Sequence, residues 1–65
     1  MNNYDLNKFW LKFFEYCERP KNANCAVRLF SDESGTLYDG FDQVIFSFGS
    51  FSEGVGKFEI LLDEA

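Results

Sequence analysis

The side chains that could carry out chemistry in this 65-residue chain are its two cysteines and its eleven acidic residues, because the sequence contains no histidine. Without histidine, no side chain has an ordinary pKa near neutrality that suits a general base. Cys17 and Cys25 have no activating partner beside them in the sequence, and they lack the C-x-x-C spacing of a metal site. We therefore expect both cysteines to be reduced and structural, with a structural disulfide as the alternative.

Three kinds of short motif resemble catalytic or binding sequences, and each lacks an essential part. The adjacent acids at residues 32–33 and 63–64 fit a turn and a terminus, where carboxylates are solvated. Residues 39–42 read Asp-Gly-Phe-Asp but lack the alternating oxygen ligands and the closing Glu of a calcium loop. Residues 54–57 read Gly-Val-Gly-Lys, but Phe51 and Phe58 replace two required residues of a phosphate loop. The sequence therefore predicts a protein that is not an enzyme and holds no metal or cofactor.

Acidic residues are concentrated in the second half of the chain. Residues 1–30 contain five bases and three acids, a sum of +2, whereas residues 31–65 contain one base and eight acids, a sum of −7. This asymmetry indicates an acidic surface that meets a basic protein, and it argues against direct binding to nucleic acid or to anionic membranes. The other interpretation is a solvated surface that keeps a Phe-rich protein soluble.

The predicted contact surface combines acids of the loops and of an open sheet face with two aromatic anchors in loops. Its members are Asp32, Glu33, Tyr38, Asp39, Asp42, Phe51, Glu53 and Glu59. Glu53 is expected in a mobile loop, and Glu59 on the open face of the sheet. Because a single exposed carboxylate contributes little to binding, we expect the summed field of these acids to matter.

Residues 5–18 are predicted to form an amphipathic helix, against which the elements that carry the contact surface must pack. One apolar stripe recurs with a period of 3.6 residues and contains Leu6, Phe9, Trp10, Phe13 and Cys17. Asn2 or Asn3 can cap the helix, Asp5 suits its first turn, and Pro20 ends it. Leu11 projects toward the polar face, and the stripe does not explain it.

After Pro20 the apolar period changes to two, which predicts strands over residues 25–30, 43–48 and 57–62. Residues 31–42 are rich in turn formers and make either a hairpin with a short strand at residues 36–38 or one long loop. Three glycines in residues 49–56 predict a mobile connection.

These elements predict a single α+β domain over residues 1–65, in which one N-terminal helix packs on a three-stranded antiparallel sheet in the order α-β-β-β. Trp10 and Phe13 are expected in its core. The face of the sheet away from the helix is expected to carry Phe30, Ile45 and Leu61. These residues are either covered by the loop around residues 37–41 or used to contact a partner or a second copy.

The same sequence predicts a soluble cytoplasmic monomer. No stretch approaches the roughly 18–20 apolar residues of a membrane span. The segment Met1–Asp5 lacks the basic start and apolar run of a signal peptide. The content of nine Phe, three Tyr and one Trp is the opposite of a disordered composition.

In its size, its acidity, its lack of catalytic residues and its compact α+β character, the chain resembles anti-CRISPR proteins, especially those that act on type I surveillance complexes. The resemblance spans the whole chain and involves no diagnostic motif, so it assigns no site residue. It implies a phage-encoded inhibitor in the bacterial host cell that binds a Cas subunit and blocks recognition of target DNA.

Two other classes of function stay open. One is a small adaptor or subunit that docks on a larger protein through Phe30, Ile45 and Leu61, in a way that salt does not affect. The other is an immunity protein that neutralises a basic nuclease toxin and, like the inhibitor, binds in a salt-dependent way.

Overall fold

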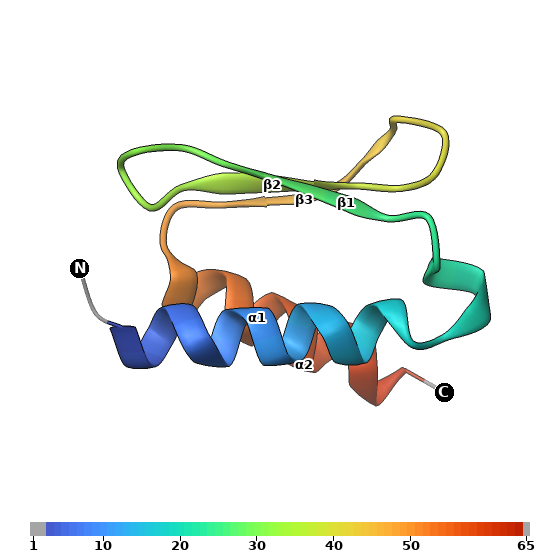
Figure 1. The fold of residues 1–65 in the computed structure, drawn as a ribbon, viewed down its shortest axis with the longest axis horizontal. Helices are drawn as coiled ribbons and strands as arrows, with labels where there is room; N and C mark the ends of the chain where they lie inside the picture. Colours follow the sequence, from blue (N-terminus) through green and yellow to red (C-terminus); the bar gives the residue numbers. More distant parts are fainter. Residues whose placement is uncertain (1–2, 65) are drawn as a thin grey trace.

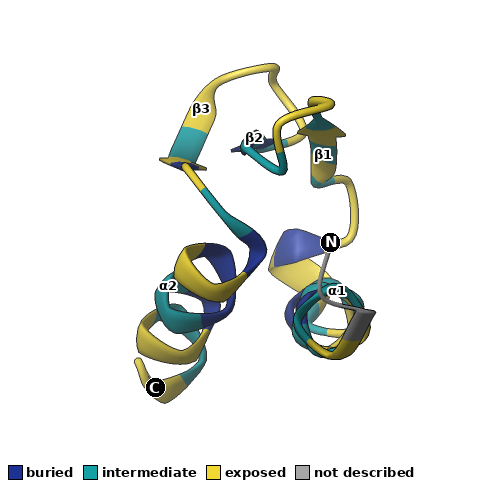
Figure 2. Ribbon diagram, turned by 90° about the vertical axis from the view of Figure 1, so that its left-hand side faces the viewer, coloured by how far each residue is buried: buried dark blue, intermediate teal, exposed yellow. Residues whose placement is uncertain are grey.

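The computed structural model describes residues 3–64 and has two layers, a three-stranded sheet and a pair of helices on one of its faces (Figure 1). The elements are α1 (Asn3–Cys17), a short 3-10 helix η1 (Pro20–Asn22), β1 (Ala26–Leu29), β2 (Gly35–Tyr38), β3 (Val44–Phe48) and α2 (Phe51–Asp63). Figure 2 shows α1 and α2 side by side under the sheet, α2 nearer β3 and α1 nearer β1. The α+β class is confirmed, whereas the prediction of a single helix is wrong.

Helix α1 confirms the amphipathic helix predicted near the N-terminus. It ends at Cys17, before Pro20 opens η1, and Asp5 lies in its first turn. Phe9 is its most deeply buried side chain, at 0% exposed, whereas Trp10 and Phe13 are half-buried and pack against the core from its edge. Of the two predicted caps, Asn2 lies outside the described residues, and Asn3 is the first residue of α1.

Helix α2 replaces both the mobile loop and the third strand that the sequence predicted for residues 49–62. The Ser50 side chain accepts a hydrogen bond from the Glu53 backbone N–H at 3.1 Å, which caps the helix. Phe51, Val55 and Phe58 then recur at helical spacing and are all buried. The alternation of apolar residues over 57–62 was therefore misread as a strand.

Gly54 allows α2 to approach α1 closely. A Cβ at this position would lie 2.8 Å from Cε1 of Phe9 and 3.3 Å from Cδ2 of Phe48. Both distances are shorter than ordinary van der Waals contact, so any side chain here must displace the core. The glycine that suggested a flexible loop therefore marks tight helix packing.

The sheet is an antiparallel meander in the order β1-β2-β3. Its first hairpin sets Val27 opposite Leu37, and the second sets Leu37 opposite Phe46, so these three side chains face the helices. Of the two alternatives for residues 31–42, the hairpin with a short strand is confirmed, since β2 is the central strand.

A β-bulge interrupts the pairing of β2 with β3 between Leu37 and Tyr38. Because of the extra residue, Val44 pairs with Tyr38 on the face away from the helices and is 59% exposed. Strict alternation over residues 43–48 would place Val44 on the core face with Phe46, and the bulge moves it to the opposite face. We call this face the outer face, and it carries Ala26, Arg28, Thr36, Tyr38, Val44 and Ser47.

The apolar residues that the sequence placed on the far side of the sheet are distributed differently. Ile45 and Leu61 are partly buried and pack against the core, and Leu61 belongs to α2. Phe30, just after β1, is 49% exposed. Phe41 is 88% exposed, so the loop that bears it does not serve as a cover.

Candidate protein-binding surface

The acidic residues of the predicted contact surface that belong to the hairpin turns lie at two opposite ends of the sheet. Asp32 and Glu33 belong to the turn between β1 and β2, and Asp39 and Asp42 belong to the loop between β2 and β3. Successive hairpin turns of a meander emerge at opposite ends, as Figure 1 shows. The turn between β1 and β2 lies at the same end of the molecule as the start of α2. The structure therefore divides the predicted acids into two groups.

The two acids of α2 do not lie where the sequence placed them. Glu53 lies in the first turn of the helix rather than in a loop, and its carboxylate is 3.5 Å from the Lys57 ammonium. Glu59 is exposed on α2 and not on the open face of the sheet. Both changes follow from the helical conformation of residues 51–63.

In the turn between β1 and β2, the acids shape the backbone. Oδ1 of Asp32 accepts hydrogen bonds from the backbone N–H of Ser34, at 3.1 Å, and from its hydroxyl. The hydroxyl bond and then the backbone bond lower the pKa of Asp32 below its ordinary value. Glu33 has φ of 69°, a left-handed conformation that the turn imposes. Asp32 is exposed, Glu33 and Ser34 are half-buried, and all three build the hairpin.

The loop between β2 and β3 is held by Asp39 and displays an aromatic side chain. Oδ1 of Asp39 accepts hydrogen bonds from the backbone N–H of Phe41, at 2.8 Å, and of Gln43, at 3.0 Å. The backbone N–H of Asp39 donates to the Gln43 carbonyl at 2.8 Å, and Asp42 adopts φ of 62°. Phe41 therefore projects from a closed loop between two carboxylates, at 88% exposure. We call residues 39–43 the Phe41 loop.

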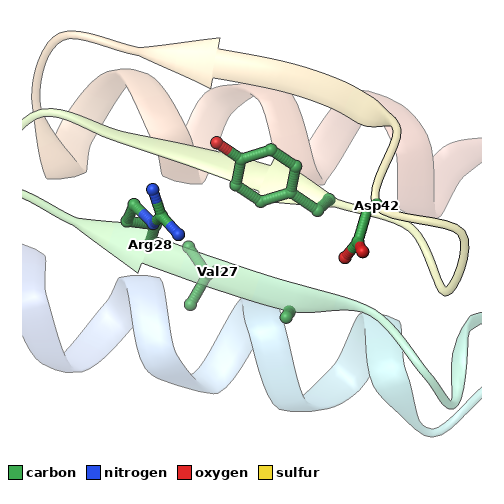
Figure 3. Close-up of a pocket in the computed structure, with 5 residues that line it drawn as sticks. Val27, Arg28 and Asp42 are labelled. Carbon is green, nitrogen blue, oxygen red and sulfur yellow. The ribbon is translucent and has the colours of Figure 1, made fainter.

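The outer face adjoins the Phe41 loop through a shallow hollow of about 400 Å³, lined by Ala26, Val27, Arg28, Tyr38 and Asp42. In Figure 3 the Arg28 side chain and the Asp42 carboxylate lie at its two sides. The Arg28 guanidinium carbon is 5.9 Å from the centre of the Tyr38 ring, so the cation contacts the ring face. Tyr and Arg are the residue types that contribute most to binding at protein interfaces.

The two predicted aromatic anchors have different outcomes. Tyr38 is half-buried on the outer face, where a partner can reach it. Phe51 is buried, at 4% exposed, with its ring centre 5.6 Å from that of Phe9, so its predicted role as a loop anchor is wrong. Sequence reasoning missed Phe41 as an anchor. An aromatic residue flanked by Asp-Gly and Asp in a turn was the available signal.

Several of the bases are committed to intramolecular contacts. Arg19 donates to the Leu62 carbonyl at 2.6 Å and to the Glu64 carbonyl at 3.3 Å, which caps the end of α2. Lys57 donates to the Ser47 carbonyl at 2.6 Å, besides pairing with Glu53. Among residues 3–64, no base forms an ion pair with the acids of the two hairpin turns. Their negative charge is therefore left to act on solvent or on a partner.

Both thiols are free and half-buried. Burial raises the pKa of the Cys17 thiol. Burial also raises the pKa of the Cys25 thiol, and the neighbouring Cys17 adds to that rise. These shifts favour the protonated thiols, which are the less reactive form.

Residues 3–64 contain no group of three side chains that could ligate a metal ion. Neither described helix has the length and apolar character needed to cross a bilayer. Comparison of the chain with protein-family models, with curated proteins and with solved structures finds no match.

Proposed function

We propose that this chain is a non-enzymatic inhibitor that binds a basic, nucleic-acid-binding surface of another protein and blocks it. The observation that carries the proposal is the Phe41 loop, which presents an 88% exposed aromatic ring between two carboxylates. The partner proposed from the overall resemblance is a DNA-recognising Cas subunit of a type I surveillance complex. The proposed setting is the cytoplasm of a bacterial host.

The negative charge of the chain supports this proposal because it can speed association with a basic partner. The chain has a net charge of −5, and the carboxylates of both hairpin turns have no basic partner within residues 3–64. Acids on a small rigid body attract the Lys and Arg side chains that otherwise hold phosphates. This attraction raises the association rate, and salt weakens it.

The shape of the Phe41 loop supports the proposed function because it can stabilise the complex once it has formed. Asp39 fixes the Phe41 loop by two hydrogen bonds, so little conformational freedom remains to be lost on binding. An exposed ring on a fixed loop can enter an apolar recess of the partner, and Tyr38 and Arg28 on the adjoining outer face add contact area. The acids then orient the complex, and the ring slows its dissociation.

The test is binding to a purified type I surveillance complex, measured with variants that keep the backbone. Glu33→Asn and Asp42→Asn together remove two charges, and Asn tolerates the left-handed conformation of both positions. Glu15→Gln and Glu18→Gln remove two charges from the region of α1 and serve as the control. We expect the hairpin variant to slow association about tenfold at low salt, and the control to change it little.

Two outcomes would contradict the proposal. One is a parent protein that does not bind the complex or compete with its target DNA. The other is an equal effect of the hairpin and control variants, because the hairpin charges would then have no special role. An immunity protein would show the same dependence on charge and salt but would bind a basic nuclease instead.

A second candidate function, an adaptor that docks through apolar contacts, is favoured by a groove between β3 and α2. The groove has a volume of about 210 Å³ and is lined by Ile45, Phe46, Lys57, Ile60 and Leu61. Ile60 at its rim is 65% exposed. Binding through this groove would be insensitive to salt. Ile60→Ser would weaken it, whereas the substitutions in the hairpin turns would leave it unchanged.

A further inference from the structure

Helix α1 exposes large apolar side chains on the face opposite its buried one. Tyr4, Leu11 and Phe14 are 69%, 67% and 57% exposed. Spacings of seven and three residues place them along one side of the helix. We call these three residues the α1 stripe. Leu11, which the amphipathic pattern did not explain, lies at its middle.

The α1 stripe is supported from beneath by the aromatic core. The Phe14 ring stacks on Trp10 with centres 6.1 Å apart, and Trp10 in turn packs edge-on against the buried Phe9 at 5.6 Å. A ring held in this way keeps its orientation before any partner arrives. Phe14 is therefore a fixed part of the stripe and not a freely moving side chain.

Charge distinguishes the α1 stripe from the other exposed apolar residues. Phe41 lies between Asp39 and Asp42, and Ile60 follows Glu59. By contrast, α1 contains two acids and two bases, which sum to zero: Asp5, Lys8, Lys12 and Glu15. Two molecules that each carry −5 repel one another least where this neutral face meets its copy.

We propose that a second copy of this chain covers the α1 stripe, with the two α1 helices packed antiparallel about a two-fold axis near Leu11. Lys8 lies before Leu11 and Glu15 after it, so antiparallel packing brings Lys8 of one copy to Glu15 of the other. Parallel packing would instead set Glu15 against Glu15. A two-fold contact makes each favourable pair twice.

The free edge of β3 is a less suitable dimer contact. Lys57 donates to the Ser47 carbonyl at 2.6 Å, and its ammonium lies 3.5 Å from the Glu53 carboxylate. A lysine across a strand edge is a common device against edge-to-edge pairing. The α1 stripe has no such block. The α1 stripe also lies on the side of α1 opposite Phe9, whose ring packs against Phe48 of β3, so the dimer leaves the Phe41 loop accessible and does not depend on the proposed inhibitor function.

Sedimentation equilibrium of the purified chain tests the proposal directly. A contact through one helix per copy is small, so we expect a dissociation constant on the order of 100 µM. The dimer should tighten as salt rises from about 50 mM to about 500 mM, because salt screens the net repulsion. This trend is opposite to that expected for the inhibitor complex. A protein that stays monomeric up to about 1 mM at high salt would overturn the proposal.

Leu11→Glu places a charge at the centre of the contact and should raise the dissociation constant about 100-fold or more. The matched control is Ile60→Glu, the same type of change at a similarly exposed residue of α2, 65% against 67%, and it should leave the dimer intact. Circular dichroism and thermal melting report whether each variant is folded. Equal disruption by the two variants, or no effect of Leu11→Glu in a folded protein, would contradict the α1 contact.

A charge exchange tests the antiparallel orientation separately. Lys8→Glu alone and Glu15→Lys alone should each weaken the dimer, whereas the double variant should restore it, because each copy again meets an opposite charge. Failure of the double variant to recover dimerisation while Leu11→Glu still abolishes it would refute the antiparallel arrangement.

Discussion

Replacement of Gly54 by alanine is expected to destabilise the protein, although glycine to alanine inside a helix ordinarily stabilises by about 0.5–1 kcal/mol. The added Cβ would lie 2.8 Å and 3.0 Å from two ring carbons of Phe9, which is 0% exposed, and 3.3 Å from a ring carbon of Phe48. Neither ring can move without disturbing the core. Overpacking of this kind costs about 1–3 kcal/mol.

Gly56 supplies the matched control within the same helix. A Cβ at Gly56 would meet nothing within 4 Å, so Gly56→Ala should show only the gain in helix propensity. The propensity gain is common to both variants and cancels in their difference. We therefore expect Gly54→Ala to be less stable than Gly56→Ala by about 1–3 kcal/mol.

Urea and thermal denaturation followed by circular dichroism measure this difference. For a domain of this size, about 1 kcal/mol shifts the melting temperature by about 4–8 °C. If residues 49–56 were a mobile loop, both substitutions would have small and similar effects. Equal stability of the two variants would refute the close packing of α1 on α2 and, with it, the assignment of α2.

Three further predictions concern the core, the end of α2 and the first hairpin turn. Phe9→Ala should destabilise by about 3–5 kcal/mol in urea denaturation, because the ring is fully buried among other rings; a loss below about 1 kcal/mol would contradict that burial. Arg19→Gln should remove the bond to the Leu62 carbonyl and speed amide exchange in the last turn of α2, while the amides in the middle of the helix stay protected. Unchanged exchange in the last turn would disprove the cap. The pKa of Asp32, followed by NMR, should lie below its ordinary value of 3.8, so its contribution to stability is present above that pH and is lost as the pH falls through the folded pKa. Ser34→Ala should raise this pKa, and an unaltered titration would show that the hydroxyl bond is absent.

The first helix could be predicted from the sequence because local signals agree there, and the turn residues of 31–42 gave a hairpin with a short strand as one of two alternatives. The apolar stripe around Phe9 persists over the length of α1, and Pro20 stops it. The turn residues around Asp32 and Asp39 make hydrogen bonds within their own turns. Where local preference and the global fold agree, the residues themselves are enough.

Helix α2 could not be predicted in the same way because its local signals conflict. Gly54 and Gly56 lower helix propensity, and the alternation of Phe58, Ile60 and Leu62 is typical of a strand. Tertiary packing selects the helical conformation of residues 51–63, since only a helix places Phe51, Val55 and Phe58 together against Phe9. The local signals that favoured a helix were the Ser50-x-x-Glu53 capping pattern and the helical spacing of Phe51, Val55 and Phe58.

The errors in the candidate site follow from that one misassigned element. Phe51, Glu53 and Glu59 were placed by a loop and a strand that do not exist. Asp39 and Asp42 lie in a loop, as expected, whereas Tyr38, proposed as a loop anchor, ends strand β2. The side-chain exposure of Phe41 depends on hydrogen bonds that the Asp39 carboxylate accepts from the backbone and that no periodicity reveals.

The packing of α1 against α2 also constrains the order of events during synthesis. The ribosome makes α1 first, yet the core that covers Phe9 draws Phe51, Val55 and Phe58 from the last helix of the chain. When the nascent chain has emerged from the ribosome only as far as the end of β3, α1 and the sheet are present but α2 is not. The core is then incomplete. Its aromatic residues remain available to chaperones until α2 leaves the exit tunnel. Folding of this domain is therefore expected to follow the emergence of α2 and not to proceed segment by segment with translation.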